Sequence, residues 1–337
     1  MEAFLTDWVD GVLSAFLDPK KRVFCVYLLC ALAIGLVWLR VQGLSLREAC
    51  KEIFSNRVWW CRSSRADYLI VIINQAVMQV LTPVIVTQLA VATFLFYKFH
   101  GITGGNTATG LTFSNTTVAV VFTSALFVLD DYSKFWLHRA LHRFPCLWAF
   151  HKVHHTATVL TPLTVYRTHP VEGLLFSIRS AVVQGIAIAT FISLFPGQVS
   201  LVTVLGANVF VVVFNVIGAN LRHSQISLPY PRVVECVFMS PAQHQIHHSM
   251  SKVHHDRNFG VALSLWDSLA GTMSHSEANK PLRFGIAGQS VPHSLQAIYI
   301  LPCAEAFAAA RSGGRSAFAR LFEKLPVCRG RDRSAVD

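Results

Sequence analysis

Residues 117–142 read TVAVVFTSALFVLDDYSKFWLHRALH, an apolar run that leads directly into two histidines. His138 and His142 are four residues apart, so on one continuous helix both imidazoles face the same side. The apolar part is about long enough to cross a hydrocarbon layer of roughly 30 Å. The stretch therefore predicts a membrane helix that carries two imidazoles on one face of its end.

Two further histidine clusters follow the first one. HKVHH occupies residues 151–155 and HQIHH occupies residues 244–248, both with the spacing of one helix face. Neutral imidazoles bind Fe, Zn, Cu and Ni rather than Mg or Ca. Eight imidazoles exceed the coordination capacity of one tetrahedral or octahedral ion, so the clusters predict two metal ions. The predicted ligands are His138, His142, His151, His154, His155, His244, His247 and His248.

The composition indicates an integral membrane protein. Of 337 residues, 53% are hydrophobic and 14% are charged, against roughly 25% charged in an ordinary soluble domain. The second of five long apolar runs allows either one helix or two pieces broken near Pro83. The last two runs are joined by only LFPGQV, which predicts a tight helical hairpin. The runs cover residues 23–39, 68–97, 117–137, 173–195 and 199–218.

The positions of Lys and Arg predict the orientation of these runs. Six basic residues lie between the first two runs, whereas residues 99–116 contain none. By the positive-inside rule the basic segment is cytoplasmic, and tracing onward places all three histidine clusters on that face. The formal net charge of +11 fits contact with anionic lipid headgroups better than nucleic-acid binding. We therefore expect an all-α integral membrane helical bundle with a cytoplasm-facing, histidine-rich dimetal cap.

Iron and zinc both accept imidazole ligands, but each would support a different chemistry. Zinc has no redox chemistry and would be structural or hydrolytic, whereas a pair of nitrogen-ligated irons can activate O2 to attack an unactivated C–H bond. Three hypotheses follow: an O2-dependent lipid oxidoreductase, a zinc-dependent lipid hydrolase, and a non-catalytic membrane metal-binding or transport protein. The sequence contains no HExxH motif, and the clusters lie at the ends of apolar runs rather than along a path within them.

The clusters and their neighbours resemble the fatty acid hydroxylase and sterol desaturase superfamily of membrane di-iron enzymes. Residues 131–142 match the family's D-x-x-x-[FY]-W-x-H-R-x-x-H box, and residues 151–155 and 243–249 match its second and third boxes. The order and spacing of the motifs agree from residue 131 to about 272. Further matches are His169-Pro170 with Glu172, Asn220-Leu-Arg-His223-Ser224, Asn258-Phe259-Gly260 and Trp266-Asp267.

The resemblance implies an O2-dependent enzyme that hydroxylates or desaturates a membrane lipid, whether fatty acyl, sterol-like or another isoprenoid. It implies two Fe ions held by the eight cluster histidines, with His223 as a further ligand. Electrons would come from an external carrier, cytochrome b5 or ferredoxin with its reductase, because the chain has no dinucleotide fingerprint. Arginine outnumbers lysine, which favours a bacterial inner membrane over the endoplasmic reticulum of a eukaryote.

Under this interpretation the chain divides at residues 116 and 275. Residues 1–116 are expected to contain an interfacial N-terminal helix and membrane helices, and residues 117–275 the catalytic region with the three histidine boxes. Residues 276–337 are expected to form a cytoplasmic tail. Eight scattered cysteines without a CxxC pair favour neither a thiolate metal site nor a disulfide framework.

Four residues near the boxes receive separate predictions. Asp131 lies two helical turns before His138, so its carboxylate would accept the second N–H of a ligand imidazole. The alternative for this residue is a plain surface acid. His169 is expected to form hydrogen bonds at the start of a helix rather than to bind metal. His254 and His255 are kept outside the ligand set.

Overall fold

The computed structural model describes residues 2–82, 87–103, 113–204, 206–277, 281–288 and 293–311. Helices dominate these ranges, and the strands among them form one short hairpin. The longer helices are α1 (Glu2–Leu17), α2 (Cys25–Val41), α5 (Arg62–Leu81), α6 (Gln88–Thr103), α7 (Asn115–Arg143), α8 (Pro145–His155), α9 (Pro170–Leu194) and α14 (Leu301–Arg311). The shorter elements are α3 (Leu46–Ile53), α4 (Asn56–Trp59), η2 (Pro162–Tyr166), β1 (Thr203–Val204), β2 (Ala207–Asn208), α10 (Val209–Val216), η3 (Ala219–His223), α11 (Arg232–Glu235), α12 (Pro241–His247), η4 (Lys252–His254), α13 (Leu265–Ala270) and η5 (Gln296–Ile300).

Helix α7 confirms that the apolar run continues as one helix through the first histidine cluster. Ser114 caps its start by accepting a hydrogen bond from the N–H of Thr117, which satisfies one of the otherwise unpaired N–H groups of the first turn. The helix ends at Arg143, and Pro145 then occupies the first turn of α8, where its missing N–H costs nothing. Two helices with histidines are thus joined by a sharp corner.

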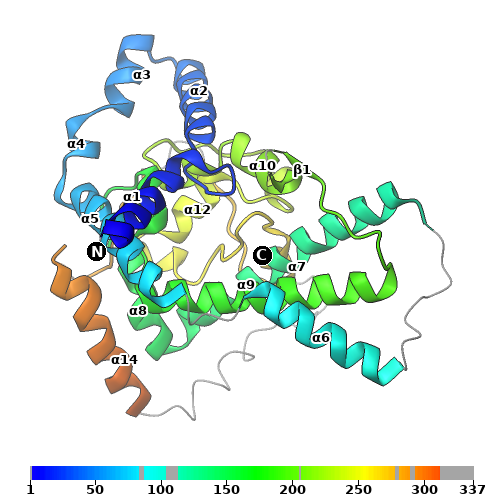
Figure 1. Ribbon diagram of the computed structural model, residues 1–337. Coiled ribbons are helices and arrows are strands. Elements are labelled where there is room, and N and C mark those ends of the chain that lie inside the picture. The colour runs from blue at the N-terminus through cyan, green and yellow to red at the C-terminus, as the bar shows by residue number, and fades with distance from the viewer. Residues whose placement is uncertain are drawn as a thin grey trace, which may run out of the picture.

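Helices α7 and α9 run antiparallel and pack against each other (Figure 1). The ring of Phe113, just before α7, lies 5.9 Å from that of Phe195, just after α9. Nearer the other end, the Arg179 guanidinium of α9 binds the Asp130 carboxylate of α7 at 3.0 Å. The end of α7 and the start of α9 therefore lie together, and this is the end that carries the histidines.

Among the described residues, α9 is the one helix long and apolar enough to cross a membrane, judged by length and composition. Helix α2 is apolar but has 17 residues. The second apolar run forms two helices, α5 and α6, and Pro83 between them lies outside the described residues. Helix α6 packs along α9, where a Cβ on Gly185 would lie only 2.6 Å from the Cβ of Val91.

The fifth apolar run does not form the second arm of the predicted helical hairpin, so that prediction is wrong. Strands β1 and β2 pair Thr203 with Asn208 around a turn that contains Gly206. The φ of Gly206 is 77°, a left-handed value outside the range of a right-handed α-helix. Asn208 then caps α10, which has eight residues. Such a helix is roughly 12 Å long, far less than the hydrocarbon thickness of a bilayer.

The remaining elements cover the histidine end of the bundle. Helix α1 is present as expected, and its Trp8 indole donates a hydrogen bond to the carbonyl of Ile72 in α5 at 3.0 Å. On the other side, the amide of Gln245 in α12 donates to the carbonyls of Leu221 (3.1 Å) and Ser224 (3.0 Å), which holds α12 against η3. The Gln245 contacts hold the third histidine cluster beside His223 of η3.

Candidate metal centre

The structure brings all nine histidines predicted as ligands together in two groups. Within each group the ring nitrogens lie within 4.8 Å of one another. Eight of the nine side chains are buried, and His142 is half-buried. The first group contains His138, His142, His151, His155 and His247, and the second group contains His154, His223, His244 and His248.

The HxxHH spacing explains why the second and third clusters each contribute to both groups. Residues four apart on a helix share a face, whereas successive residues point about 100° apart. In α8, His151 and His155 therefore face the first group and His154 faces the second. At α12 the division is reversed, because His247 alone faces the first group.

The nitrogen separations in the second group fit a shell of ligands around a cation. The Nε2 atom of His223 lies 3.2 Å from that of His154, 3.2 Å from that of His248 and 3.1 Å from that of His244. Imidazole nitrogens bound about 2.1 Å from one metal lie roughly 3.0–3.4 Å apart. A neutral imidazole has a single N–H, so these short contacts cannot all be hydrogen bonds. A cation among the four nitrogens would satisfy them together.

Hydrogen bonds fix the orientation of three rings in the first group. Each ring has its Nδ1 atom against an oxygen acceptor, so Nδ1 carries the proton and the lone pair lies on Nε2. The contacts join His138 to the carbonyl of Phe259 (2.7 Å), His247 to the carbonyl of Arg257 (2.8 Å) and His151 to Oε1 of Glu172 (2.9 Å).

The lone pairs of the first group converge as metal ligands would. The Nε2 atoms of His138 and His151 lie 3.1 Å apart, although each ring carries its proton on the other nitrogen. The Nε2 atoms of His142 and His247 are buried without a hydrogen-bond partner among the described residues. Facing lone pairs and unpaired buried nitrogens are costly unless a cation lies between them. The residues of both groups thus fit bound metal.

Burial keeps these imidazoles neutral. Removal from water lowers the pKa of every histidine in the two groups, and neighbouring rings lower most of them further. For His151 and His154 the pKa falls to about 3. Because the neutral ring is the form that binds metal, the fold prepares both groups for ligation at ordinary pH.

A strained loop supplies the two backbone carbonyls that hold His138 and His247. Asp256 and Asn258 adopt φ values of 59° and 57°, which are uncommon for residues other than glycine. The buried carboxylate of Asp267 accepts hydrogen bonds from the next two N–H groups of the loop, at 2.8 and 2.6 Å. The Asn-Phe-Gly and Trp-Asp motifs therefore shape the loop that orients ligand rings.

Asp131 does not bind an imidazole, so its predicted contact is corrected. The side chain is buried, and its carboxylate accepts hydrogen bonds from the N–H groups of Ala262 (2.8 Å) and Leu263 (3.0 Å) and from the Trp266 indole (3.0 Å). It is not a surface acid either. The N–H groups of the loop after Phe259 are buried and need an acceptor, and Asp131 supplies it from α7.

Glu172 makes the contact that was predicted for Asp131. It is buried in the first turn of α9, and its carboxylate holds Nδ1 of His151. His169 starts the same helix, accepting a hydrogen bond from the N–H of Val171 and donating one to the carbonyl of Tyr299, which confirms its expected role. His254 and His255, also kept outside the ligand set, belong to neither group.

Replacing Glu172 by glutamine tests this contact. We expect Glu172→Gln to weaken metal binding about 10-fold or more, because the amide orients His151 less strongly than a carboxylate does. Equilibrium titration of the purified apoprotein with ferrous iron, followed by elemental mass spectrometry, measures the change. Glu52→Gln, at an exposed position of α3, is the matched control and should bind metal as the unaltered protein does. Equal affinities for both variants would contradict the role of Glu172.

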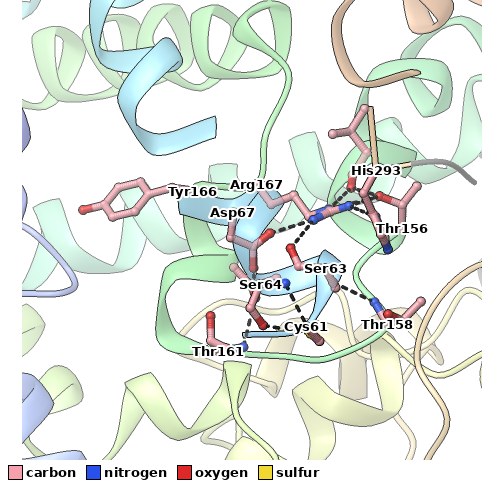
Figure 2. Close-up of polar contacts among 12 residues, drawn as sticks. Cys61, Ser63, Ser64, Asp67, Thr156, Thr158, Thr161, Tyr166, Arg167 and His293 are labelled. Atoms are coloured by element: carbon pink, nitrogen blue, oxygen red, sulfur yellow. Dashed lines mark hydrogen bonds and ion pairs between the residues drawn. The ribbon is translucent and has the colours of Figure 1, made fainter. Parts of the chain in front are cut away.

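A buried ion pair fixes the end of α8 (Figure 2). Arg167 and Asp67 are both fully buried, with Nη1 and Oδ1 2.7 Å apart. The same guanidinium donates through Nε to the carbonyl of Val153 (3.1 Å) and to Oγ1 of Thr156 (3.0 Å). Val153 directly precedes His154, so this ion pair joins the second histidine cluster to α5. Sequence spacing does not predict this ion pair, because its partners are 100 residues apart.

Both groups line one cavity of about 430 Å³, here called the histidine cavity. Phe127, Phe176 and Phe214 form an apolar part of its wall. A smaller cavity of about 340 Å³ reaches the first group from another side and is bordered by His255 and Asp256. The histidines in the wall of the histidine cavity are His138, His151, His154, His223 and His244.

Comparison with known proteins identifies the region that holds both groups. Residues 123–272 match the family model described as fatty acid hydroxylase. A Delta(7)-sterol 5(6)-desaturase of Aspergillus fumigatus is 29% identical over 152 residues, which are 45% of this chain and 38% of that protein. A lathosterol oxidase of Mus musculus is 29% identical over 141 residues, 42% of this chain and 41% of that protein.

A third relative is named for a different kind of lipid. An ornithine lipid hydroxylase of Rhizobium tropici is 26% identical over 168 residues, 48% of this chain and 44% of that protein. The match spans less than half the length of each of the three relatives. No solved structure matches the chain. Residues 123–272, which hold both groups, therefore match the fatty acid hydroxylase family, and over this region the chain is similar to a sterol desaturase, a lathosterol oxidase and a lipid hydroxylase.

Proposed function

We propose that the chain is an O2-dependent di-iron oxidoreductase that hydroxylates or desaturates a membrane lipid. The observation that carries the proposal is that two groups of neutral, buried imidazoles line the same cavity as a wall of phenylalanines. The relatives are named as a desaturase, an oxidase and a hydroxylase, and all three names denote oxidation. Zinc cannot supply that chemistry, so iron is the metal we assign to both groups.

Two bound irons would supply the activation of O2 for attack on an unactivated C–H bond. The residues of this chain supply position and exclusion of water. Glu172 and the loop carbonyls hold three ligand rings in one orientation, which limits the geometry that the metal pair can adopt. The phenylalanine wall gives a hydrocarbon chain an apolar surface beside the histidines.

We further propose that the chain is a multi-pass membrane protein with its metal centre facing the cytoplasm. Large apolar side chains are exposed along several helices, as expected where lipid replaces water, and α9 is long enough to span. The histidines lie at one end of α7 and α9, beyond the apolar segments. Examples of the exposed apolar side chains are Leu29, Val37, Phe94, Val121 and Ile186. An external carrier such as cytochrome b5 or ferredoxin with its reductase would deliver electrons at the cytoplasmic face.

Product analysis under labelled oxygen tests the proposed reaction. Membranes that contain the protein, supplied with a reductant system and ¹⁸O2, should form either a lipid with one ¹⁸O hydroxyl or a lipid with one new double bond. Both products should disappear without O2 and after removal of metal by a chelator. Release of free acids or alcohols without O2, from protein that contains zinc, would overturn the proposal in favour of a lipid hydrolase.

A further inference from the structure

A second cavity adjoins the histidine cavity. It has a volume of about 630 Å³ and lies between α1, α5 and the start of α9; we call it the α1 cavity. The two cavities share Thr168 and Gly173 in their walls. A Cβ on Gly173 would have only the sulfur of Met78 within 4 Å, at 3.6 Å, so a Cβ fits at this position in ordinary van der Waals contact. The absence of a side chain at residue 173 therefore leaves room between the cavities.

Helix α1 is held on the α1 cavity by specific contacts. It lies against α5 (Figure 1), and Gln79 of α5 donates a hydrogen bond to the carbonyl of Phe4 at 3.3 Å. Trp8 binds the α5 backbone farther along α1. Gly11 approaches α5 so closely that a Cβ there would lie 1.9 Å from Nε2 of Gln75. The N-terminal helix is therefore a wall of the cavity and not a loose surface segment.

The two cavities offer different chemistry to a ligand. Phenylalanines form part of the histidine cavity beside charged side chains such as Lys134 and Arg222, whereas the uncharged side-chain amides of Asn74, Gln75 and Gln79 line the α1 cavity. Oε1 of Gln79 is buried without a hydrogen-bond partner among the described residues. One acid, Asp7, and one base, Lys21, border the α1 cavity, so its charges cancel. Asn74 is already bonded to Thr168 and Tyr299, so the amides of Gln75 and Gln79 are the groups that suit a polar ligand group with no net charge.

Tyr166 adds to the same wall. Its ring points away from the Arg167–Asp67 ion pair (Figure 2), and it lines the α1 cavity. The amide of Asn74 binds the carbonyl of Thr168 at 2.8 Å, which fixes the segment between η2 and α9 where the cavities meet. The junction is thus built on backbone held from α5.

We propose that the two cavities hold a single lipid, with its hydrocarbon beside the histidines and its polar, uncharged or zwitterionic end beneath α1. The proposal rests on the proposed function and adds to it the class of substrate and its orientation. Gly173 is then a position that determines specificity, because a larger side chain there would divide the two cavities.

Photolabelling tests this orientation without requiring turnover. The probes are two 18-carbon monoacylglycerols, one with a diazirine on the last chain carbon and one with a diazirine on the glycerol, irradiated with the purified full chain in lipid nanodiscs. We expect the glycerol probe to label residues 7–15 and 71–82, and the chain-end probe to label residues near Phe127, Phe176 and Phe214. Peptide mass spectrometry locates the labels.

Substitution at Gly173 provides the second measurement. Gly173→Leu should abolish chain-end labelling of the histidine cavity, whereas Gly173→Ala should keep it because a Cβ fits there. Gly101→Leu, at a position of α6 with nothing within 4 Å of its Cβ, is the matched control and should label normally. Unchanged chain-end labelling in Gly173→Leu, or glycerol labels away from α1 and α5, would overturn the proposal. If labelling follows expectation but no O2-dependent product forms, the binding site stands and the proposed function fails.

Discussion

His247→Ala and His244→Ala are each expected to bind one metal ion per chain where the unaltered protein binds two. His247 belongs only to the first group and His244 only to the second, so each substitution removes a ligand from one ion. Both variants should lose lipid oxidation, because the proposed reaction needs the pair of ions in one cavity. Elemental mass spectrometry of the purified proteins measures the stoichiometry, and circular dichroism verifies that they remain folded.

His255→Ala is the matched control for these variants. His255 lies close in sequence to the third cluster, but it is exposed and belongs to neither group. It should keep both ions. If His247→Ala and His244→Ala also retained two ions, the groups would not be metal sites. Loss of both ions from either variant would contradict their division into two separately occupied sites.

Residue type and helical spacing made the gathering of the histidines predictable. HKVHH and HQIHH place imidazoles on identifiable helix faces, and the structure brings them together with His223. Spacing alone does not say which faces of different helices meet, so the assignment of His154 to a different group from His151 required the contacts of His154 with His223 and His248. The sequence determines which histidines share a helix face, and tertiary contacts determine which histidines of other helices they meet.

The contacts that orient the rings could not be predicted in the same way. Two of the three acceptors are backbone carbonyls, and a carbonyl has no residue-type signature. The third acceptor, Glu172, lies 21 residues from His151, and no helical spacing relates them. Asp131 satisfied the spacing rule but faces buried N–H groups instead. A buried carboxylate accepts hydrogen bonds from whichever unpaired donors the fold places beside it.

The fifth apolar run shows a second reason why the sequence did not predict the secondary structure. Residues 199–218 are rich in valine, and a short apolar run of β-branched residues is compatible with helix and with strand alike. Gly206 permits the turn between β1 and β2, and Asn208 delays the start of α10. Mean hydropathy therefore overstated the length of helix that this segment forms.

Asp67→Ala is expected to destabilise the protein by about 3–5 kcal/mol, because it leaves the Arg167 charge buried without its partner. The cost is large since both side chains are fully buried and water cannot replace the carboxylate. Denaturant unfolding in detergent, followed by intrinsic tryptophan fluorescence, measures the free energy of unfolding. Glu305→Ala is the matched control: it breaks an ion pair with Lys152 of α8, but the Glu305 side chain is only half-buried, at 37% exposure, so the loss should be at most about 1 kcal/mol.

The double variant Asp67→Ala with Arg167→Met separates the charge from the other contacts of the guanidinium. Removing the unpaired charge should restore part of the stability lost in Asp67→Ala. The double variant should lose metal binding in the second group, because it lacks the hydrogen bonds from Arg167 to Val153 and Thr156 that hold the turn of α8 carrying His154. Single Asp67→Ala chains that remain folded keep those bonds and should keep both ions. Equal metal content in the two variants would show that Arg167 stabilises the fold without positioning the second histidine cluster.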